Sequence, residues 1–181
     1  MAEWEATVEK YSPLVWRISW RMLGNEADAA DCYQETFLSA LRFARREPVR
    51  QWGGLLRRLA MSRALDMLRR RVREREHFDN EPGAEAVDGS AGPGELAEGG
   101  ELVVRLRAAL GRLPADQAEV FSLYTLEGQS YREIASLLGL KRTTVGVLLH
   151  RARRELRRWL SEGEEWSGSR FNDERSQEHT R

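Results

Sequence analysis

Cysteine and histidine are scarce in this chain of 181 residues, and their scarcity narrows the range of functions. The single cysteine, Cys32, excludes an internal disulfide and any cysteine-based zinc site, and its apolar, helical surroundings predict a small core residue. The three histidines, His77, His150 and His179, are scattered, and no Ser/His/Asp set, phosphate-binding glycine loop or metal-ligand spacing accompanies them. We therefore expect no catalytic site, no cofactor and no metal.

Long apolar runs are also absent. No stretch approaches the ~18 apolar residues of a membrane-spanning helix, and the acidic start, MAEWEATVEK, is unlike a secretory signal peptide. These features predict a cytoplasmic protein without membrane insertion.

Charge is balanced over the whole chain but unevenly distributed along it. Residues 42–76 hold 12 Arg and 4 acids, residues 77–101 hold 7 acids and neither Lys nor Arg, and residues 131–160 hold 8 basic residues and 2 acids. Two basic blocks separated by an acidic segment indicate nucleic-acid binding. Only 2 of the 29 basic residues are Lys. Arg suits bidentate contacts to phosphate and guanine, although a GC-rich genome would produce the same bias.

The stretch 130–158 has the pattern of a helix, a turn and a second, basic helix. Ser130 and Glu133 form a capping box, and Gly139 is typical of a helix end. Thr143 or Thr144 is the expected cap of the second helix, whose apolar stripe is flanked by arginines. A helix–turn–helix of this kind places its second helix in the DNA major groove. The alternative is an ordinary helical hairpin with a solvated arginine face.

The rest of the chain also has helical periodicity, and we expect an all-α fold. Helices are predicted over 4–23, with Pro13 as a break or kink, over 26–46, from Leu55, over 101–113 and from about Ala115. Trp52-Gly53-Gly54 reads as a mobile, aromatic-bearing connection. The expected architecture is two small helical bundles joined by a flexible acidic linker, the second bundle containing the helix–turn–helix. The expected domains are 1–76 and 101–160, with a disordered linker 77–100 and a disordered tail 161–181.

Three motifs in this order resemble the extracytoplasmic-function (group 4) sigma factors of bacterial RNA polymerase. They are Gly24-Asn25 followed by DAADCYQETFLSAL (28–41), LLRRLAMSRALDMLRRR (55–71), and LPADQAEVFSLYTLEGQSYREIASLLGLKRTTVGVLLHRARREL (113–156). The resemblance implies a specificity subunit that is not an enzyme. It would bind the clamp and flap of core RNA polymerase and direct promoter-specific initiation, opening the −10 element and reading the −35 element. An anti-sigma factor is a further partner typical of the family.

The resemblance also assigns residues to these roles. The clamp-binding positions are Asp28, Asp31, Gln34 and Glu35. The positions for the −10 element are Ser62, Arg63, Asp66, Arg69 and Arg70. We add Arg58, from the same arginine-rich stretch, and Trp52, which lies three residues before the Leu55 that stands where the family usually has Trp. Those for the −35 element are Arg142, Thr143, Thr144, Val147 and Arg151.

Physical chemistry supports this division of roles. The arginines from 57 to 73 would track phosphates next to extruded bases. The carboxylates of Asp28, Asp31 and Glu35 would repel DNA and suit a protein partner. Two alternatives stay open: a helix–turn–helix regulator that binds duplex DNA without polymerase, and an adaptor that has lost DNA recognition. Gly146-Val147-Leu148 suggests the second, because the family commonly has Lys-Ser-Arg there.

Overall fold

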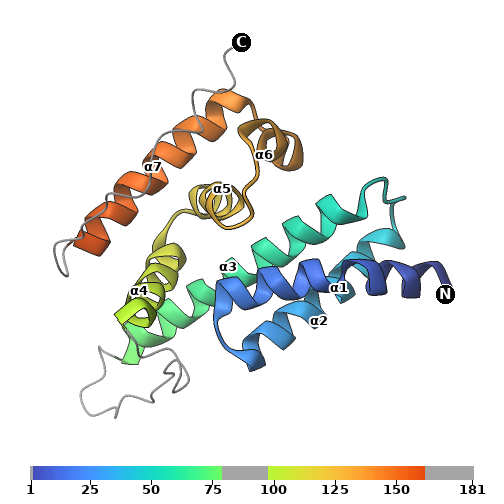
Figure 1. The fold of residues 1–181 in the computed structure, drawn as a ribbon, viewed down its shortest axis with the longest axis horizontal. Coiled ribbons are helices and arrows are strands. Elements are labelled where there is room, and N and C mark those ends of the chain that lie inside the picture. Colours follow the sequence, from blue (N-terminus) through green and yellow to red (C-terminus); the bar gives the residue numbers. More distant parts are fainter. Residues whose placement is uncertain (1, 79–97, 162–181) are drawn as a thin grey trace.

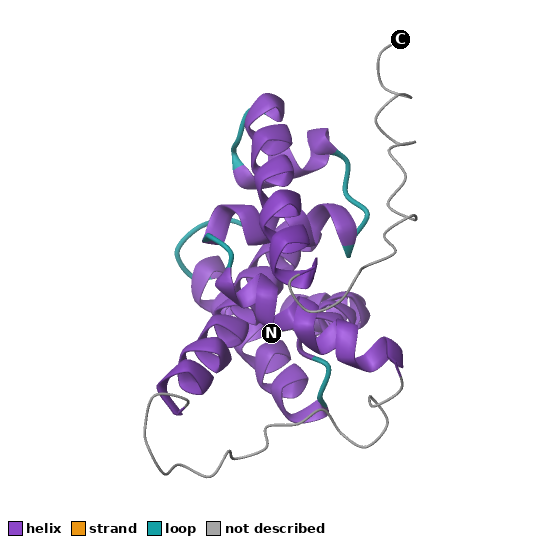
Figure 2. Ribbon diagram, turned by 90° about the vertical axis from the view of Figure 1, so that its left-hand side faces the viewer, coloured by secondary structure: helices purple, strands orange, loops and turns teal. Residues whose placement is uncertain are grey.

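The computed structural model describes residues 2–78 and 98–161, and every regular element within these ranges is an α-helix (Figures 1 and 2). The all-α fold predicted from the sequence is confirmed. The helices are α1 (Ala2–Leu23), α2 (Glu26–Ala44), α3 (Trp52–Phe78), α4 (Glu98–Arg112), α5 (Ala115–Thr125), α6 (Tyr131–Leu138) and α7 (Arg142–Ser161).

The first bundle consists of α1, α2 and α3. The chain reverses between α1 and α2 at Gly24, whose φ of 74° is in the left-handed region that favours glycine. Asn25 then caps α2, because its side chain accepts a hydrogen bond from the Asp28 N–H. The two antiparallel helices pack against α3 through buried side chains, including those of Ile18 and Met61. Cys32 is buried here as expected, and burial raises the pKa of its thiol, which disfavours the reactive thiolate.

Of two expectations for the first bundle, one is wrong and the other is wrong in part. Pro13 does not break the chain, because α1 continues through this residue; a kink there, the alternative expectation, stays a prediction. Trp52-Gly53-Gly54 is not a mobile connection but the first turn of α3. The Trp52 ring lies 5.6 Å from that of Trp4, and a Cβ at Gly53 would be only 3.2 Å from the Tyr11 ring. This aromatic packing outweighs the low helix propensity of glycine.

The second bundle consists of α4 to α7 and contains the helix–turn–helix. The predicted capping box is confirmed: the Ser130 N–H donates to Glu133 Oε2 at 2.8 Å, and the Glu133 N–H donates to Ser130 Oγ at 3.3 Å. Gly139 ends α6 with a φ of 68°, also as predicted. The expected cap at Thr143 or Thr144 is wrong, because α7 begins at Arg142 and both threonines lie in its first turn.

The two bundles pack directly against each other. In Figure 1, α4 lies across the C-terminal part of α3 and α5 is on the same side of α3. One continuous cluster of buried apolar side chains extends through both bundles. Gly111 of α4 lies close to α3, because a Cβ at this position would meet the carbonyl oxygen of Leu68 and Cγ2 of Val72 at 2.9 Å. Helices α3 and α4 also take in both ends of the expected linker 77–100; its remaining residues, 79–97, lie outside the described residues, as does the tail beyond Ser161.

This contact predicts opposite effects of alanine at two helical glycines. Gly111→Ala should destabilise the protein, because the new methyl group meets backbone atoms of α3 that cannot move aside alone. Gly146→Ala in α7 is the matched control, since its Cβ would lie at an ordinary 3.6 Å from the Tyr131 ring. There, the better helix propensity of alanine should stabilise the protein by up to about 1 kcal/mol. Urea unfolding of both variants measures the difference; equal stabilisation by both would contradict the close packing of α3 and α4.

Candidate nucleic-acid and polymerase surfaces

The solvent side of α3 displays most of the residues predicted to contact the −10 element. Arg58, Ser62, Arg63, Asp66 and Arg70 are exposed, and their spacing places them along one side of the helix. This row of polar and cationic side chains is accessible to a nucleic-acid strand.

Three other side chains of α3, one tryptophan and two arginines, are partly buried. Trp52 is half-buried against Trp4, so its ring is not displayed with the exposed row. Arg69 is only 23% exposed, and its Nη1 lies 2.9 Å from Asp66 Oδ1. Arg57, expected in the phosphate track, is half-buried and faces the second bundle. The residues predicted on α3 therefore fall into two groups, one exposed to solvent and one partly buried.

The exposed side of α7 carries the residues predicted for the −35 element. Arg142, Thr143, Val147 and Arg151 are exposed, with Val147 at 49%, whereas Thr144 is half-buried. The opposite side packs on α5 and α6 through buried residues, which fixes the orientation of the exposed side. The same exposed side includes two residues that the motif comparison missed, and their spacing from Val147 and Arg151 was the available signal: His150 and Arg154.

The α2 positions predicted to bind the polymerase clamp also differ in their exposure to solvent. Asp31 and Gln34 are exposed, and Glu35 is half-buried. Asp28 is different, because its carboxylate forms an ion pair with Arg71 of α3 and accepts a hydrogen bond from Asn25 Nδ2 at 3.1 Å. Asp28 therefore joins α2 to α3 instead of extending the exposed acidic face.

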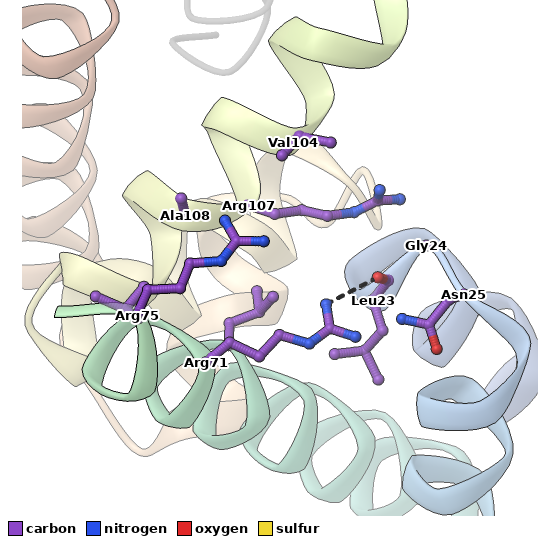
Figure 3. Close-up of a pocket in the computed structure, with 10 residues that line it drawn as sticks. Leu23, Gly24, Asn25, Arg71, Arg75, Val104, Arg107 and Ala108 are labelled. Carbon is purple, nitrogen blue, oxygen red and sulfur yellow. Dashed lines mark hydrogen bonds between the residues drawn. The ribbon is translucent and has the colours of Figure 1, made fainter. Parts of the chain in front are cut away.

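Arginines also close the end of α1, next to a small cavity of about 50 Å³ (Figure 3). Arg71 Nη1 donates to the Leu23 carbonyl at 3.2 Å, and Arg107 Nη2 donates to the Arg21 carbonyl at 3.3 Å. These bonds satisfy carbonyls that a helix C-terminus leaves unpaired. The cavity has room for only about one or two water molecules, well below the size of a ligand pocket.

Glu127, which follows α5, lies at the centre of a cluster of arginines between the two bundles. Its side chain is only 2% exposed. Oε2 lies 3.3 Å from Arg17 Nη2 and 3.8 Å from Arg57 Nε, and Oε1 lies 3.9 Å from Arg21 Nη1. Arg21 also donates to the Leu126 carbonyl at 2.6 Å. One carboxylate of the second bundle is thus surrounded by three guanidinium groups of the first.

Two regions of the chain match known families: residues 7–74 match "Sigma-70 region 2" and residues 104–156 match "Sigma-70, region 4". The chain is 30% identical to the ECF RNA polymerase sigma factor SigL of Mycobacterium tuberculosis, with 87% of this chain and 88% of SigL covered. This chain is a member of the extracytoplasmic-function sigma factors.

Other relatives agree with this membership. The chain is 34% identical to the ECF RNA polymerase sigma factor SigE of Mycolicibacterium smegmatis over 89% of its own length, and it spans 63% of the length of that protein. Its fold is similar to that of the sigma factor RpoE from Bartonella quintana, with a TM-score of 0.51, 21% identity, and coverage of 91% of this chain and 100% of RpoE. That RpoE was solved in complex with the anti-sigma factor NepR.

Within the described ranges of this sigma factor, no three His, Cys, Asp or Glu side chains are grouped so that they could hold a metal ion. None of the described helices combines the length and apolar character needed to cross a membrane.

Two glutamates of the second bundle have pKa values shifted in opposite directions. Burial raises the pKa of the Glu119 carboxyl, against the opposing effect of Arg58, whose Nε lies 4.0 Å from Glu119 Oε1. Hydrogen bonds from the Ser130 N–H and hydroxyl lower the pKa of Glu133. Ionisation of the Glu119 carboxyl therefore costs the folded state free energy, whereas the folded state stabilises the ionised carboxylate of Glu133.

These shifts predict opposite pH dependences for two substitutions. Because the folded-state pKa of Glu119 is raised, its contribution to stability is present at low pH and is lost as pH rises through that pKa. Glu119→Gln should therefore gain stability relative to wild type as pH rises above about 4.3, the ordinary pKa of a glutamate side chain. The contribution of Glu133 is present at neutral pH and is lost as pH falls through its lowered pKa, so the destabilisation by Glu133→Gln should shrink on acidification. Free energies of unfolding in urea, measured from well below the ordinary glutamate pKa of about 4.3 up to neutral pH, provide the test, and equal slopes for both variants would refute the assignment.

Proposed function

We propose that this sigma factor binds core RNA polymerase and directs promoter-specific transcription initiation. The observation that carries the proposal is the presence of an exposed cationic row on α3 and another on α7, together with an exposed acidic face on α2. The α3 row lies in the region 2 match and the α7 row in the region 4 match. Specificity would come from DNA contacts, and the nucleotidyl transfer chemistry would belong to the polymerase.

The α3 row is suited to a melted −10 element. Arg63 presents its guanidinium group to a backbone phosphate, and Arg70 would do so after exchanging Glu74, whose Oε1 lies 2.7 Å from Arg70 Nε. Ser62 and Asp66 on the same side of α3 present hydrogen-bonding groups to bases. Arg58 would join this set after exchanging Glu119 for phosphate. The outward position of these side chains lets a single strand run along the helix axis.

The α7 row is suited to the major groove of a duplex −35 element. Arg142 and Arg151 are long enough to reach phosphates or guanine edges, and Thr143 offers a hydroxyl. Val147 presents its methyl groups where contact with a thymine methyl is favourable. The proposed −35 surface of α7 therefore has a small apolar centre at Val147 flanked by arginines, where the family commonly has Lys-Ser-Arg.

The domain division and the partners are part of the same proposal. Residues 1–76 would act as the clamp-binding and −10 domain, and residues 101–160 as the flap-binding and −35 domain. Because polymerase and chromosome are both in the bacterial cytoplasm, the protein would act there. An anti-sigma factor is a candidate regulator, supported by the family and by the RpoE–NepR complex.

Charge reversal on α2 should weaken polymerase binding. The double substitution Asp31→Lys and Glu35→Lys places cations on the face proposed to meet a basic polymerase surface, so we expect at least a tenfold rise in the Kd for core enzyme. Glu5→Lys and Glu9→Lys, which reverse the same charge at exposed sites of α1, are the matched control and should have little effect. Unchanged affinity in the α2 variant would reject the contact.

Removing cations from α7 should weaken −35-dependent initiation. In run-off transcription with core enzyme, Arg142→Gln and Arg151→Gln should each cost about 1–3 kcal/mol if they contact bases, and should reduce the salt slope by about 1 if they contact phosphate. Arg157→Gln, exposed near the other end of α7, is the control. Equal activity on promoters with and without a −35 element would eliminate this role. Specific duplex binding without any association with core enzyme would instead indicate a polymerase-independent regulator.

A further inference from the structure

An open groove lies where the end of α1 meets the second bundle. Its volume is about 390 Å³, which is within the range of small-molecule sites. The residues that line it come from α1, from α4, and from the end of α5 with the residue after it: Arg21, Met22, Val103, Leu106, Arg107, Leu110, Thr125 and Leu126. Both bundles therefore contribute to one concave surface.

The floor of the groove is aliphatic. Two of its apolar side chains, those of Met22 and Leu110, are almost fully buried. The others are accessible, because Leu106 and Leu126 are half-buried and Val103 is 40% exposed. None of the described residues that line the groove is aromatic. Flexible aliphatic side chains adapt to a flexible partner, so this lining suits an alkyl chain better than a flat ring.

Arginines form the polar rim of the groove. The Arg21 side chain is 52% exposed, and Arg107 extends from α4 over the end of α1 (Figure 3). Arg21 donates to the Leu126 carbonyl at 2.6 Å, and Arg107 donates to the Arg21 carbonyl at 3.3 Å, which fixes both guanidinium groups beside the groove. The neighbouring carboxylate of Glu127 has three arginines around it, so the net charge there is positive. The rim would therefore attract an anionic group.

We propose that this groove binds an amphipathic anion with an alkyl chain and a carboxylate head, the chemistry of a medium-chain fatty acid. The chain would lie on the aliphatic floor, and the carboxylate would accept a hydrogen bond from the half-exposed guanidinium of Arg21. The inference goes beyond the proposed contacts with polymerase and promoter, because none of the residues assigned to those contacts lines the groove.

Binding would act on the arrangement of the two bundles. Arg21 and Met22 belong to the first bundle, whereas the other lining residues belong to the second. A ligand that contacts both is bound only while the bundles are packed together, so it stabilises the packed arrangement by mass action. The site would thus let this chain respond to a small metabolite.

Two other occupants fit the groove less well. A nucleic-acid strand would be attracted by the arginines, but its bases stack on aromatic side chains, and the described lining has none. A second copy of this chain, related by a two-fold axis at the groove, would bring the arginines of both rims together. An aliphatic anion is the occupant that both the floor and the rim favour.

Decanoate is the test ligand, used with the full-length chain below its micelle concentration. Calorimetric titration should show binding, and the unfolding temperature should rise with decanoate concentration. Propionate has the carboxylate without the chain, and decyltrimethylammonium has the chain with a positive head. Neither control ligand should raise the unfolding temperature, and an equal rise with decyltrimethylammonium would reject the role of the arginines and the proposal with it.

Two neighbouring residues of α4 provide matched variants. Val103 and Leu102 are both 40% exposed, but of the two only Val103 lines the groove. Val103→Glu places a carboxylate at the groove and should raise the Kd for decanoate at least tenfold, whereas Leu102→Glu should leave it within twofold of wild type. Val103→Leu keeps the lining apolar and should stay within threefold. Thermal unfolding without ligand establishes that each variant folds.

Three further results would overturn the proposal. The first is a wild-type protein whose unfolding temperature does not respond to decanoate. The second is an equal loss of affinity in Val103→Glu and Leu102→Glu, which would indicate adsorption to exposed apolar side chains in general. The third is concentration-dependent dimerisation that Val103→Glu abolishes, which would assign the groove to a second copy of the chain.

Discussion

The arrangement of the two bundles depends on one buried carboxylate, that of Glu127, among Arg17, Arg21 and Arg57. A carboxylate removed from water is costly unless cations and hydrogen bonds replace its solvation, and the three cations around Glu127 belong to the opposite bundle. The cluster is therefore asymmetric: the second bundle supplies one negative charge, and the first supplies three positive charges. Apolar packing of α4 and α5 on α3 provides area, whereas this cluster determines which residues of the α5–α6 turn face α1.

Because α1 and α3 use some of their arginines for this purpose, the remaining ones are divided between two tasks. On α3, Arg57 faces inward and Arg63 outward, although both belong to the same basic run. A helix has a period of 3.6 residues, so a run of arginines must point to several sides. The density of positive charge in the sequence thus exceeds the density on any single surface. The exposure of each arginine therefore separates candidate DNA contacts, such as Arg63, from cations that stabilise the fold, such as Arg57.

The sequence was sufficient for local features and insufficient for those that depend on distant contacts. Caps at Ser130 and Gly139 were predicted because each is set by neighbours within a few residues. The first turn of α3 was missed, since two glycines argue against a helix until the Trp4–Trp52 contact is known. The Glu127 cluster was also missed, because its cations lie 70 to 110 residues away along the chain and an isolated glutamate before glycine reads as a turn. Family motifs proposed residues for three surfaces, but did not distinguish an exposed residue such as Asp31 from Asp28, which forms an ion pair within the fold.

That last distinction has a consequence for genetics. Asp28 belongs to the motif associated with polymerase binding, yet its carboxylate joins the start of α2 to Arg71 and, through that side chain, to the end of α1. A screen for loss of transcription would recover substitutions at Asp28 and at Asp31 with the same phenotype. The first class would act by loosening the junction of three helices, and higher temperature would aggravate the defect. The second would act on association, and a higher concentration of the protein would suppress it.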